Sequence, residues 1–262
     1  MSRPPTNDLS LALRLAEVAG DLALPLFERG VVSQAKDDGS PVTEADFAVE
    51  AALMDILTQA RPNDGVLSEE GGSRRGVRRR WILDPIDGTV NFAAGDPNWG
   101  THVALEVDGE LEVGVVTRPV AREVWWAVRS GGAFHLHGSS EPVAFHVSNT
   151  SALDEARVTM WPAVPGPTLD ALKEAAIWVE PDWSLLRGLL DGRLDGIVAV
   201  SGGVWDHAPP VLLTREAGGE FTDHEGGQRL DTGGGIYSNG GIHGQLREIV
   251  RSSPPRTRRR IV

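Results

Sequence analysis

The chain contains 262 residues, enough for one large domain or two tightly packed lobes, and its 40% hydrophobic and 24% charged residues are ordinary for a globular protein. Its 25 basic and 37 acidic residues give a formal net charge of −12, which argues against nucleic acid or an anionic membrane as a partner. The lack of cysteine excludes disulfides, thiolate metal sites and cysteine nucleophiles, and no apolar run approaches the roughly 18 residues of a membrane span.

Two helices are predicted near the N-terminus. Leucine and valine recur at helical spacing over residues 9–27, which predicts an amphipathic helix whose last turn is disturbed by Pro25. A second helical pattern ends at residue 60. Thr43 and Asp46 precede it with the spacing of a capping box, which indicates where this helix begins.

An arginine-rich segment that reaches Arg80 is expected to be a solvated loop, and the apolar residues 81–83 that follow are expected to be a strand. Further on, residues 103–107 and 111–115 alternate between apolar and polar side chains on either side of Asp108-Gly109. This dipeptide is typical of tight hairpin turns, so the pattern predicts a β-hairpin.

The remaining elements alternate along the chain. Strands are expected at 123–128, 133–137, 157–160 and 196–200, and helices at 168–176, 184–190 and 206–216. Helix pairs alternating with antiparallel strands indicate a layered α+β architecture rather than a doubly wound parallel sheet. We expect one domain over residues 1–251, with lobes of about 1–145 and 146–251, and a disordered tail at 252–262 that is rich in Pro and Arg.

The most informative stretch is residues 84–89, which directly follow the predicted strand at 81–83 and place Asp84 at the end of that strand. Asp87 returns beside it, and two acids this close repel each other unless cations lie between them, as in two-metal phosphate chemistry. Gly88 and Thr89 can present backbone N–H groups to a phosphate at a helix start. The alternative interpretation is a surface turn that caps a helix.

Three other acids occur at comparable places. Glu69 follows a short strand at 66–67, Asp46 stands at a helix start, and Asp206 begins a later apolar helix. Taken singly, each has an ordinary alternative, which is a solvated glutamate pair for Glu69 and helix capping for the two aspartates.

Taken in their order along the chain, the four stretches around Asp46, Glu69, Asp84 and Asp206 resemble the inositol monophosphatase family, and the resemblance extends from about Leu9 to Ile249. The resemblance implies the layered αβαβα sandwich of the inositol monophosphatase and fructose-1,6-bisphosphatase type, usually as a homodimer. It also implies a phosphoric monoester hydrolase that uses two or three Mg²⁺ ions per site, with Mn²⁺ as a possible substitute. All-oxygen ligands are what Mg²⁺ prefers.

The resemblance further implies roles for individual residues. The implied metal ligands are Glu69, Asp84, the carbonyl of Ile86, Asp87 and Asp206. The implied catalytic residues are Thr89, Asp46 and Glu69, and the implied substrate contacts are Gly88, Thr89, Asp87 and Asp182. Thr89, paired with Asp46, would orient a metal-activated water for in-line attack and help to take its proton.

The substrate would be a small polyol, cyclitol, sugar or amino-alcohol monophosphate, with histidinol phosphate and inositol 1-phosphate as specific alternatives. Relatives acting on those two carry an acid seven residues before the metal-binding Asp of the Trp-Asp motif, but that position is Ala199 here. Asp182 matches a second acid of histidinol-phosphate phosphatases. We therefore expect a sugar or cyclitol phosphate to be the better substrate.

Other features leave alternatives open. The seven histidines do not cluster at metal-ligand spacing, and His207 is interpreted as a structural or pocket-rim residue. Trp99 and Trp183 are candidates for lining a substrate pocket. Pro209 is expected in the first turn of its helix, where its missing N–H costs little.

A catalytically silent relative that binds a ligand or partner is the alternative of another class. We expect a cytoplasmic protein without a nucleic-acid or membrane partner.

Overall fold

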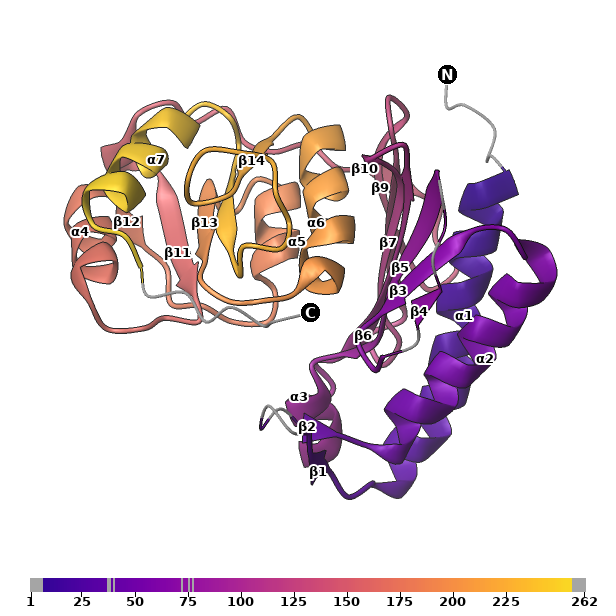
Figure 1. The fold of residues 1–262 in the computed structure, drawn as a ribbon. Helices are drawn as coiled ribbons and strands as arrows, with labels where there is room; N and C mark the ends of the chain where they lie inside the picture. The colour runs from indigo at the N-terminus through magenta and orange to yellow at the C-terminus, as the bar shows by residue number, and fades with distance from the viewer. Residues whose placement is uncertain are drawn as a thin grey trace. The chain divides into compact units, whose positions relative to one another are not determined.

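The computed structural model describes residues 7–36, 39, 41–71, 73–74, 76 and 78–255. It divides into two compact units, called here the first unit (residues 1–143) and the second unit (residues 144–262), each with its own apolar core (Figure 1). Most of the tail that was predicted to be disordered, from residue 256 on, lies outside the described residues. None of the helices in the described ranges has the length and apolar character needed to cross a membrane.

In its described residues, the first unit combines three helices with an eight-stranded sheet and a two-stranded ribbon. The helices are α1 (Asn7–Arg29), α2 (Glu44–Ala60) and α3 (Thr89–Ala94). The sheet order is β10-β9-β8-β7-β6-β5-β3-β4, and the ribbon pairs β1 (Gln34–Ala35) with β2 (Pro41–Val42). The sheet strands are β3 (Gly65–Ser68), β4 (Ser73–Arg74), β5 (Arg79–Asp87), β6 (Gly100–Val107), β7 (Glu110–Arg118), β8 (Glu123–Val128), β9 (Gly132–His137) and β10 (Val143–Ala144).

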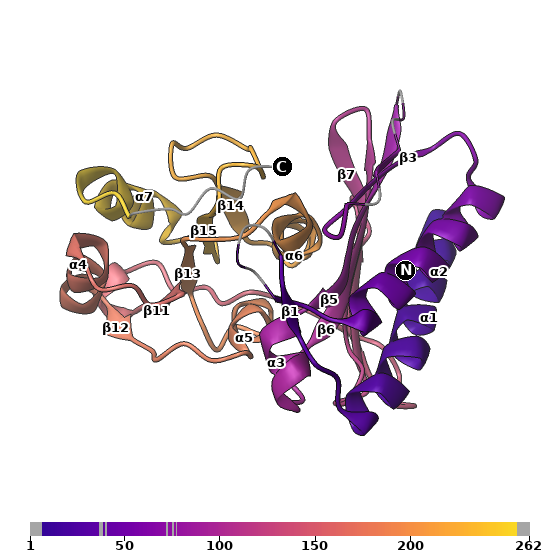
Figure 2. The same cartoon turned by 60° about the horizontal axis from the view of Figure 1, so that its bottom comes forward.

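Helices α1 and α2 cover one face of this sheet (Figures 1 and 2). Alternate residues of the central strands point toward them and form the core with the apolar faces of both helices, as period-two strands and a period-3.6 helix require. The sheet residues of this core include Trp81, Leu83, Val103, Leu105, Val113 and Val115. The opposite face of the same strands is therefore the one that presents their remaining side chains.

The predicted capping box of α2 is confirmed, because Thr43 is the N-cap and both of its hydrogen bonds with Asp46 are present. The predicted hairpin is also confirmed. Asp108 and Gly109 have φ values of 52° and 85°, the positive values that the twist of a two-residue hairpin turn demands.

The arginine-rich segment is more ordered than predicted. Strand β5 already begins at Arg79, whose Nε lies 3.0 Å from Oδ2 of Asp64. Asp64 is buried and also accepts a hydrogen bond of 2.9 Å from Nε1 of Trp81. This buried carboxylate holds Arg79 in the sheet, and Arg80 is held by Oε2 of Glu106 at 2.9 Å, so neither arginine lies in a solvated loop.

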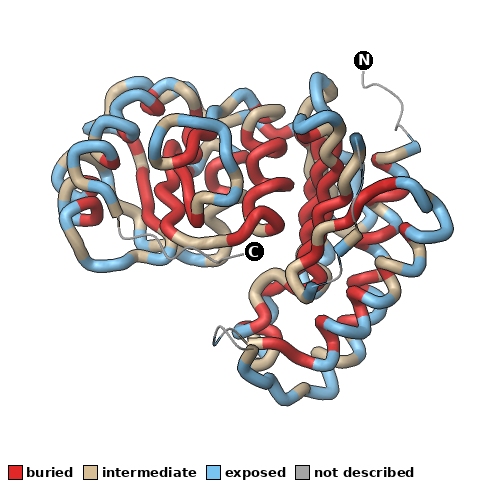
Figure 3. Tube along the Cα trace, viewed as in Figure 1, coloured by how far each residue is buried: buried red, intermediate tan, exposed pale blue. Residues whose placement is uncertain are grey.

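The second unit is a three-layered arrangement around a mixed five-stranded sheet of order β12-β11-β13-β15-β14. Its strands are β11 (Arg157–Trp161), β12 (Ile177–Trp178), β13 (Gly196–Ala199), β14 (Glu220–Thr222) and β15 (Gly235–Ser238). Its helices are α4 (Pro167–Ala175), α5 (Leu185–Leu190), α6 (Val204–Glu216) and α7 (His243–Ser252), with a 3₁₀ turn at Leu153–Glu155. Figure 2 shows α4 and α7 on one face of the sheet and α5 and α6 on the other. Figure 3 shows that the strands of both sheets are largely buried.

Helix α6 begins two residues earlier than predicted. Its first residue is Val204, so Asp206 lies within the first turn and the prediction that Pro209 belongs to that turn was wrong. Pro209 and Pro210 lie in the second turn, and each lacks one N–H donor to the helix. Both are buried, so packing of this apolar helix offsets the lost hydrogen bonds.

A buried carboxylate organises the second unit. Asp195 has no exposed surface and accepts hydrogen bonds from the hydroxyl of Ser148, from the backbone N–H of Arg157 at 2.7 Å and from its Nε at 3.1 Å. Burial by itself raises the pKa of Asp195, but the hydrogen bonds from Ser148 and Arg157 outweigh burial and lower it. The ionised carboxylate therefore joins the chain before β11 to the start of β13.

We predict that Asp195→Ala lowers the free energy of unfolding by about 2–4 kcal/mol, because it leaves buried donors unsatisfied. Urea denaturation measures the change, and Asp191→Ala is the matched control. Asp191 pairs with Arg193 at the surface, so its loss should cost less than about 1 kcal/mol. Equal effects of the two substitutions would contradict the role given to Asp195.

The same carboxylate predicts a pH dependence. Since the folded-state pKa of Asp195 is lowered, the stabilisation that this carboxylate gives is present above its ordinary pKa of 3.8 and is lost as the pH falls through the folded value. The difference in unfolding free energy between the unaltered chain and Asp195→Asn should therefore shrink below about pH 4.

Candidate active site

A β-bulge brings the two acids after the predicted strand to the same face of the first sheet. In the β5–β6 ladder Asp84 pairs with His102 and Asp87 pairs with Gly100, so two residues of β5 stand opposite Thr101 alone. In a regular strand, residues three apart point to opposite faces, but one extra residue reverses that. The shift is visible in the core, where Leu83 is followed by Ile86. The hydroxyl of Thr101 donates to the carbonyl of Pro85 at 2.9 Å and holds the bulge.

Asp84, Asp87 and His102 each offer one ligand atom, and these atoms lie within 4.8 Å of one another. Asp84 is only 1% exposed and His102 4% exposed. Two acids and an imidazole in this arrangement suit a divalent cation, which would relieve the repulsion between the buried carboxylates.

Arg118, at the end of β7, is a second cationic neighbour of Asp87. Its Nη1 lies 3.1 Å from Oδ2 of Asp87, and Nε2 of His102 lies 3.3 Å from the same oxygen. Burial by itself raises the pKa of Asp87, but the charges of His102 and Arg118 and the hydrogen bond from Arg118 lower it below its usual value.

The guanidinium of Arg118 is held in a fixed place. Its Nη1 donates to the carbonyl of Thr117 at 3.2 Å, and its Cζ lies 5.9 Å from the centroid of the Trp125 ring. A Cβ atom at Gly100 would come within 2.3 Å of Nη1 and within 1.9 Å of the Thr117 carbonyl oxygen. Glycine is therefore required at position 100 for the chain to pass this close.

Thr89 lies beside Asp46, as the resemblance implies. Its hydroxyl is 3.3 Å from Oδ1 of Asp46 and 3.1 Å from the carbonyl oxygen of Ile86. The other oxygen of Asp46 accepts from the N–H and the hydroxyl of Thr43 at 2.8 and 2.6 Å. Burial raises the pKa of Asp46 in spite of these hydrogen bonds. Gly88 precedes α3 in the left-handed conformation, with φ of 86°.

Glu69 and Glu70 share one cation. Nζ of Lys36 lies 3.3 Å from Oε1 of Glu69 and 2.6 Å from Oε1 of Glu70. Burial raises the pKa of Glu70 to about 7, although the hydrogen bond and charge of Lys36 act in the opposite direction. Glu69 therefore belongs to a glutamate pair whose negative charge is compensated by Lys36, and not to a solvated pair.

The remaining predicted site residues belong to the second unit. Oδ2 of Asp206 accepts from the backbone N–H of Gly203 and completes the first turn of α6. Oδ1 of Asp182 accepts from the N–H and the hydroxyl of Ser184, each at 2.7 Å, and Ser184 is the residue directly before α5. Ala199 is buried in β13.

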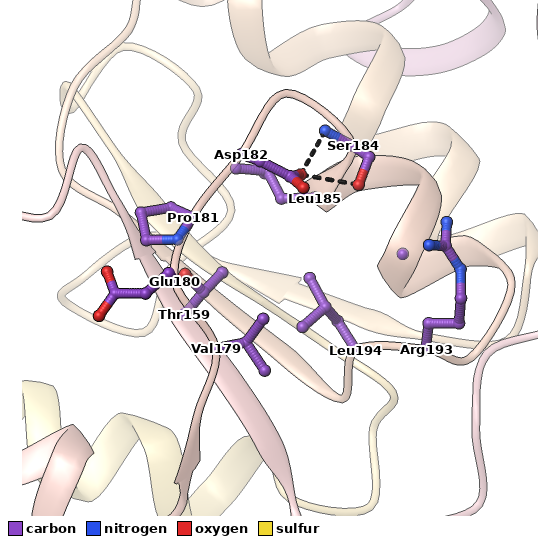
Figure 4. Close-up of a pocket in the computed structure, with 10 residues that line it drawn as sticks. Thr159, Val179, Glu180, Pro181, Asp182, Ser184, Leu185, Arg193 and Leu194 are labelled. Atoms are coloured by element: carbon purple, nitrogen blue, oxygen red, sulfur yellow. Dashed lines mark hydrogen bonds between the residues drawn. The ribbon is translucent and has the colours of Figure 1, made fainter.

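Asp182 also lines a cavity of about 240 Å³ within the second unit (Figure 4). The cavity is bounded by the segment before α5, by Thr159 of β11 and by Leu194. Its charged lining residues are already engaged, since Glu180 accepts from Nε1 of Trp178 and Arg193 pairs with Asp191.

The predictions for Trp99, Trp183 and His207 have different outcomes. Trp99 is fully buried against Phe92, with ring centroids 4.8 Å apart, so its assignment to a substrate pocket was wrong. Trp183 packs edge-on against Trp161. His207 is buried and its Nδ1 lies 2.6 Å from the hydroxyl of Tyr237, which confirms a structural role.

Sequence reasoning missed His102 and Arg118. No spacing along the chain links them to Asp87, because strand pairing across β5, β6 and β7 brings them together. The available signal was a histidine at position 102, directly before the predicted hairpin strand at 103–107.

Comparison with known proteins gives a consistent family match. The sequence profile of the inositol monophosphatase family matches residues 6–254. A Streptomyces griseus protein named glucose-1-phosphate thymidylyltransferase is 46% identical over 251 residues, which are 94% of this chain and 96% of that protein. The histidinol-phosphatase of Mycobacterium tuberculosis is 36% identical over 92% of this chain and 96% of its own length.

The crystal structure of extragenic suppressor protein suhB from Bartonella henselae aligns with a TM-score of 0.83 at 28% identity, over 94% of this chain and 99% of that one. This similarity confirms the α+β sandwich class predicted from the sequence.

We predict that Arg118→Gln raises the affinity of the Asp84–Asp87 pair for Mg²⁺ by about tenfold, because it removes a positive charge next to one of the carboxylates. Isothermal titration of the metal-free chain measures this affinity. The control is Arg129→Gln, since Arg129 pairs with Glu112 on the same sheet. Unchanged or weaker binding in Arg118→Gln would show that Arg118 does not compete with a cation.

Proposed function

Because this chain belongs to the inositol monophosphatase family and is a phosphatase of small-molecule phosphates, we propose that it is a Mg²⁺-dependent phosphomonoesterase with Asp84 and Asp87 at its centre. The observation that carries the proposal is the bulge in β5, which gives these two acids a common face. The proposed ligands are those implied by the resemblance: Glu69, Asp84, the Ile86 carbonyl, Asp87 and Asp206. Mn²⁺ would replace Mg²⁺.

The donor set supports a bound divalent cation. When bound, such ions neutralise charge on the phosphoryl group and lower the pKa of water. The carboxylates of Asp84 and Asp87 are buried acceptors that a cation would compensate. The carbonyl oxygen of Ile86 lies 3.1 Å from the hydroxyl of Thr89, so backbone and side-chain oxygens lie close together at the bulge.

Proton transfer is assigned to Thr89 and Asp46. The Thr89 hydroxyl can donate to Oδ1 of Asp46 and accept from the attacking water, which orients that water. Burial raises the pKa of Asp46, so its carboxylate is a better proton acceptor than an exposed one. We assign the N–H groups of Gly88 and Thr89 to the phosphoryl oxygens and Glu69 to support of the water.

The proposed substrate is a sugar or cyclitol monophosphate. Ala199 replaces the acid that would bind inositol 1-phosphate or histidinol phosphate, which remain the specific alternatives. One oxygen of Asp182 is already engaged by Ser184, which supports only a limited substrate contact for this side chain. A homodimer, a cytoplasmic location and the lack of nucleic-acid or membrane partners stay predictions.

The name of the Streptomyces griseus relative suggests a second candidate, transfer of a thymidylyl group to glucose 1-phosphate. The two reactions differ in product, because transfer keeps the sugar phosphate and releases pyrophosphate, whereas hydrolysis releases phosphate. Incubation of the chain with glucose 1-phosphate and Mg²⁺, with and without dTTP, therefore separates them. We expect phosphate release that does not depend on dTTP.

We predict that a panel of monophosphates assayed with Mg²⁺ gives the highest kcat/KM for a sugar or cyclitol phosphate. Asp84→Asn should lower kcat by about a hundredfold or more at saturating Mg²⁺ while circular dichroism stays unchanged. Full activity in EDTA would refute the metal-dependent mechanism. A histidinol phosphate kcat/KM above all others would refute the substrate class alone.

We predict that Thr89→Ala lowers kcat by about 10²–10⁴-fold with little change in KM, because its hydroxyl acts on the water rather than on the bound substrate. Thr89→Ser keeps the hydroxyl and should recover most of the activity. A raised KM at unchanged kcat would restrict Thr89 to phosphate binding.

A further inference from the structure

His102 is a buried side chain next to the candidate metal ligands to which the proposed mechanism gives no role. It stands directly opposite Asp84 in the β5–β6 ladder, and directly paired residues project from the same face of a sheet. Val103 and Leu105 point to the apolar core, so His102 faces the side on which the bulge places Asp87. The imidazole is therefore positioned by strand pairing.

The distances also favour a common ion. The ligand atoms of Asp84, Asp87 and His102 lie within 4.8 Å of one another, and Nε2 of His102 lies 3.3 Å from Oδ2 of Asp87. Bonds of about 2.0–2.2 Å from one ion to oxygen and nitrogen ligands would bring such atoms slightly closer together. Small side-chain shifts suffice for this, since all three residues lie on two neighbouring strands.

We propose that His102 is a metal ligand together with Asp84 and Asp87, and that this chain prefers a divalent transition-metal ion such as Mn²⁺ to Mg²⁺ at that site. This inference rests on the proposed metal-dependent function and changes its preferred metal. On metal binding, Nε2 would release any proton that it shares with Asp87 and act as the ligand atom of a neutral imidazole, with the ring proton on Nδ1.

The ligand chemistry explains the preference. Mg²⁺ is held by charge and by oxygen ligands, whereas imidazole nitrogen suits transition-metal ions better. Arg118 already offsets part of the negative charge of Asp87, which disfavours every cation at that carboxylate. The nitrogen lone pair of His102 restores affinity mainly for ions that bind nitrogen well.

A simpler role for His102 is a hydrogen bond to Asp87 without contact to the ion. A residue that only orients a ligand changes the affinity for Mn²⁺ and Mg²⁺ by a similar factor, whereas a nitrogen ligand affects Mn²⁺ more. The ratio of the two affinities therefore separates the two roles.

His135 provides a matched control. It lies on β9 and pairs with Trp125, which itself pairs with Val116, the partner of His102, so both histidines share one row across the sheet. Nε2 of His135 lies 3.4 Å from Oε1 of Glu123. His135→Gln thus removes an imidazole from the same face of the sheet without changing the proposed ligands.

The experiment uses the full chain freed of metal and then loaded with Mn²⁺. Pulsed electron paramagnetic resonance of bound Mn²⁺ should show a nitrogen coupling in the unaltered chain and in His135→Gln, and the coupling should vanish in His102→Gln. Isothermal titration should show that His102→Gln loses about ten- to a hundredfold in Mn²⁺ affinity and less than about threefold in Mg²⁺ affinity.

Four results would overturn the proposal. Lack of a nitrogen coupling in the unaltered chain would overturn it, and this result needs no variant. Mg²⁺-dependent phosphate release would in that case still support the proposed function. Persistence of the coupling in His102→Gln, or an equal loss of affinity for both ions, also does so. Lack of any divalent-ion binding would refute both the inference and the proposed function.

Discussion

Several carboxylates of the first unit lie close together where water hardly reaches them. Asp46 and Asp84 are each 1% exposed, and the side chain of Glu70 is 2% exposed. Buried like charges lose hydration and repel one another, so each needs a proton, a hydrogen-bond donor or a cation nearby. Lys36 forms ion pairs with Glu69 and Glu70, and the Thr43 hydroxyl donates a hydrogen bond to Asp46. Arg118 and His102 both lie next to Asp87. The proposed metal ion would add further compensation where Asp84 and Asp87 meet.

The backbone creates this convergence through a change in strand phase. Trp81 and Leu83 direct the first part of β5 toward the helices, and Ile86 resumes the apolar pattern one residue late. The bulge between them interrupts the regular β5–β6 pairing at one position, and it turns Asp87 to the same face of the sheet as Asp84. It also takes the Ile86 carbonyl out of the regular pairing register. Gly100 on the neighbouring strand leaves the space in which Arg118 reaches Asp87.

Local features of this arrangement could be predicted from the sequence, and features that depend on strand register could not. The capping box at Thr43 and Asp46 and the strand that leads into Asp84 follow from residue order within a few positions. His102 joins the acids only through the pairing of β5 with β6, which spacing along the chain does not reveal. The early start of α6 at Val204 was missed because Asp206, a residue type that often caps helices, indicated a later start, whereas the N-cap is Gly203.

The division into two units matters for the way the protein is made. Residues 1–143 leave the ribosome first, and they contain both the apolar core of α1, α2 and the sheet and the compensating partners of its acids, Lys36 and Arg118. Lys36, Thr43 and Arg118 are therefore translated together with the acids that they contact in the first unit. These acids have their protein partners within the first unit while the second unit is still being synthesised.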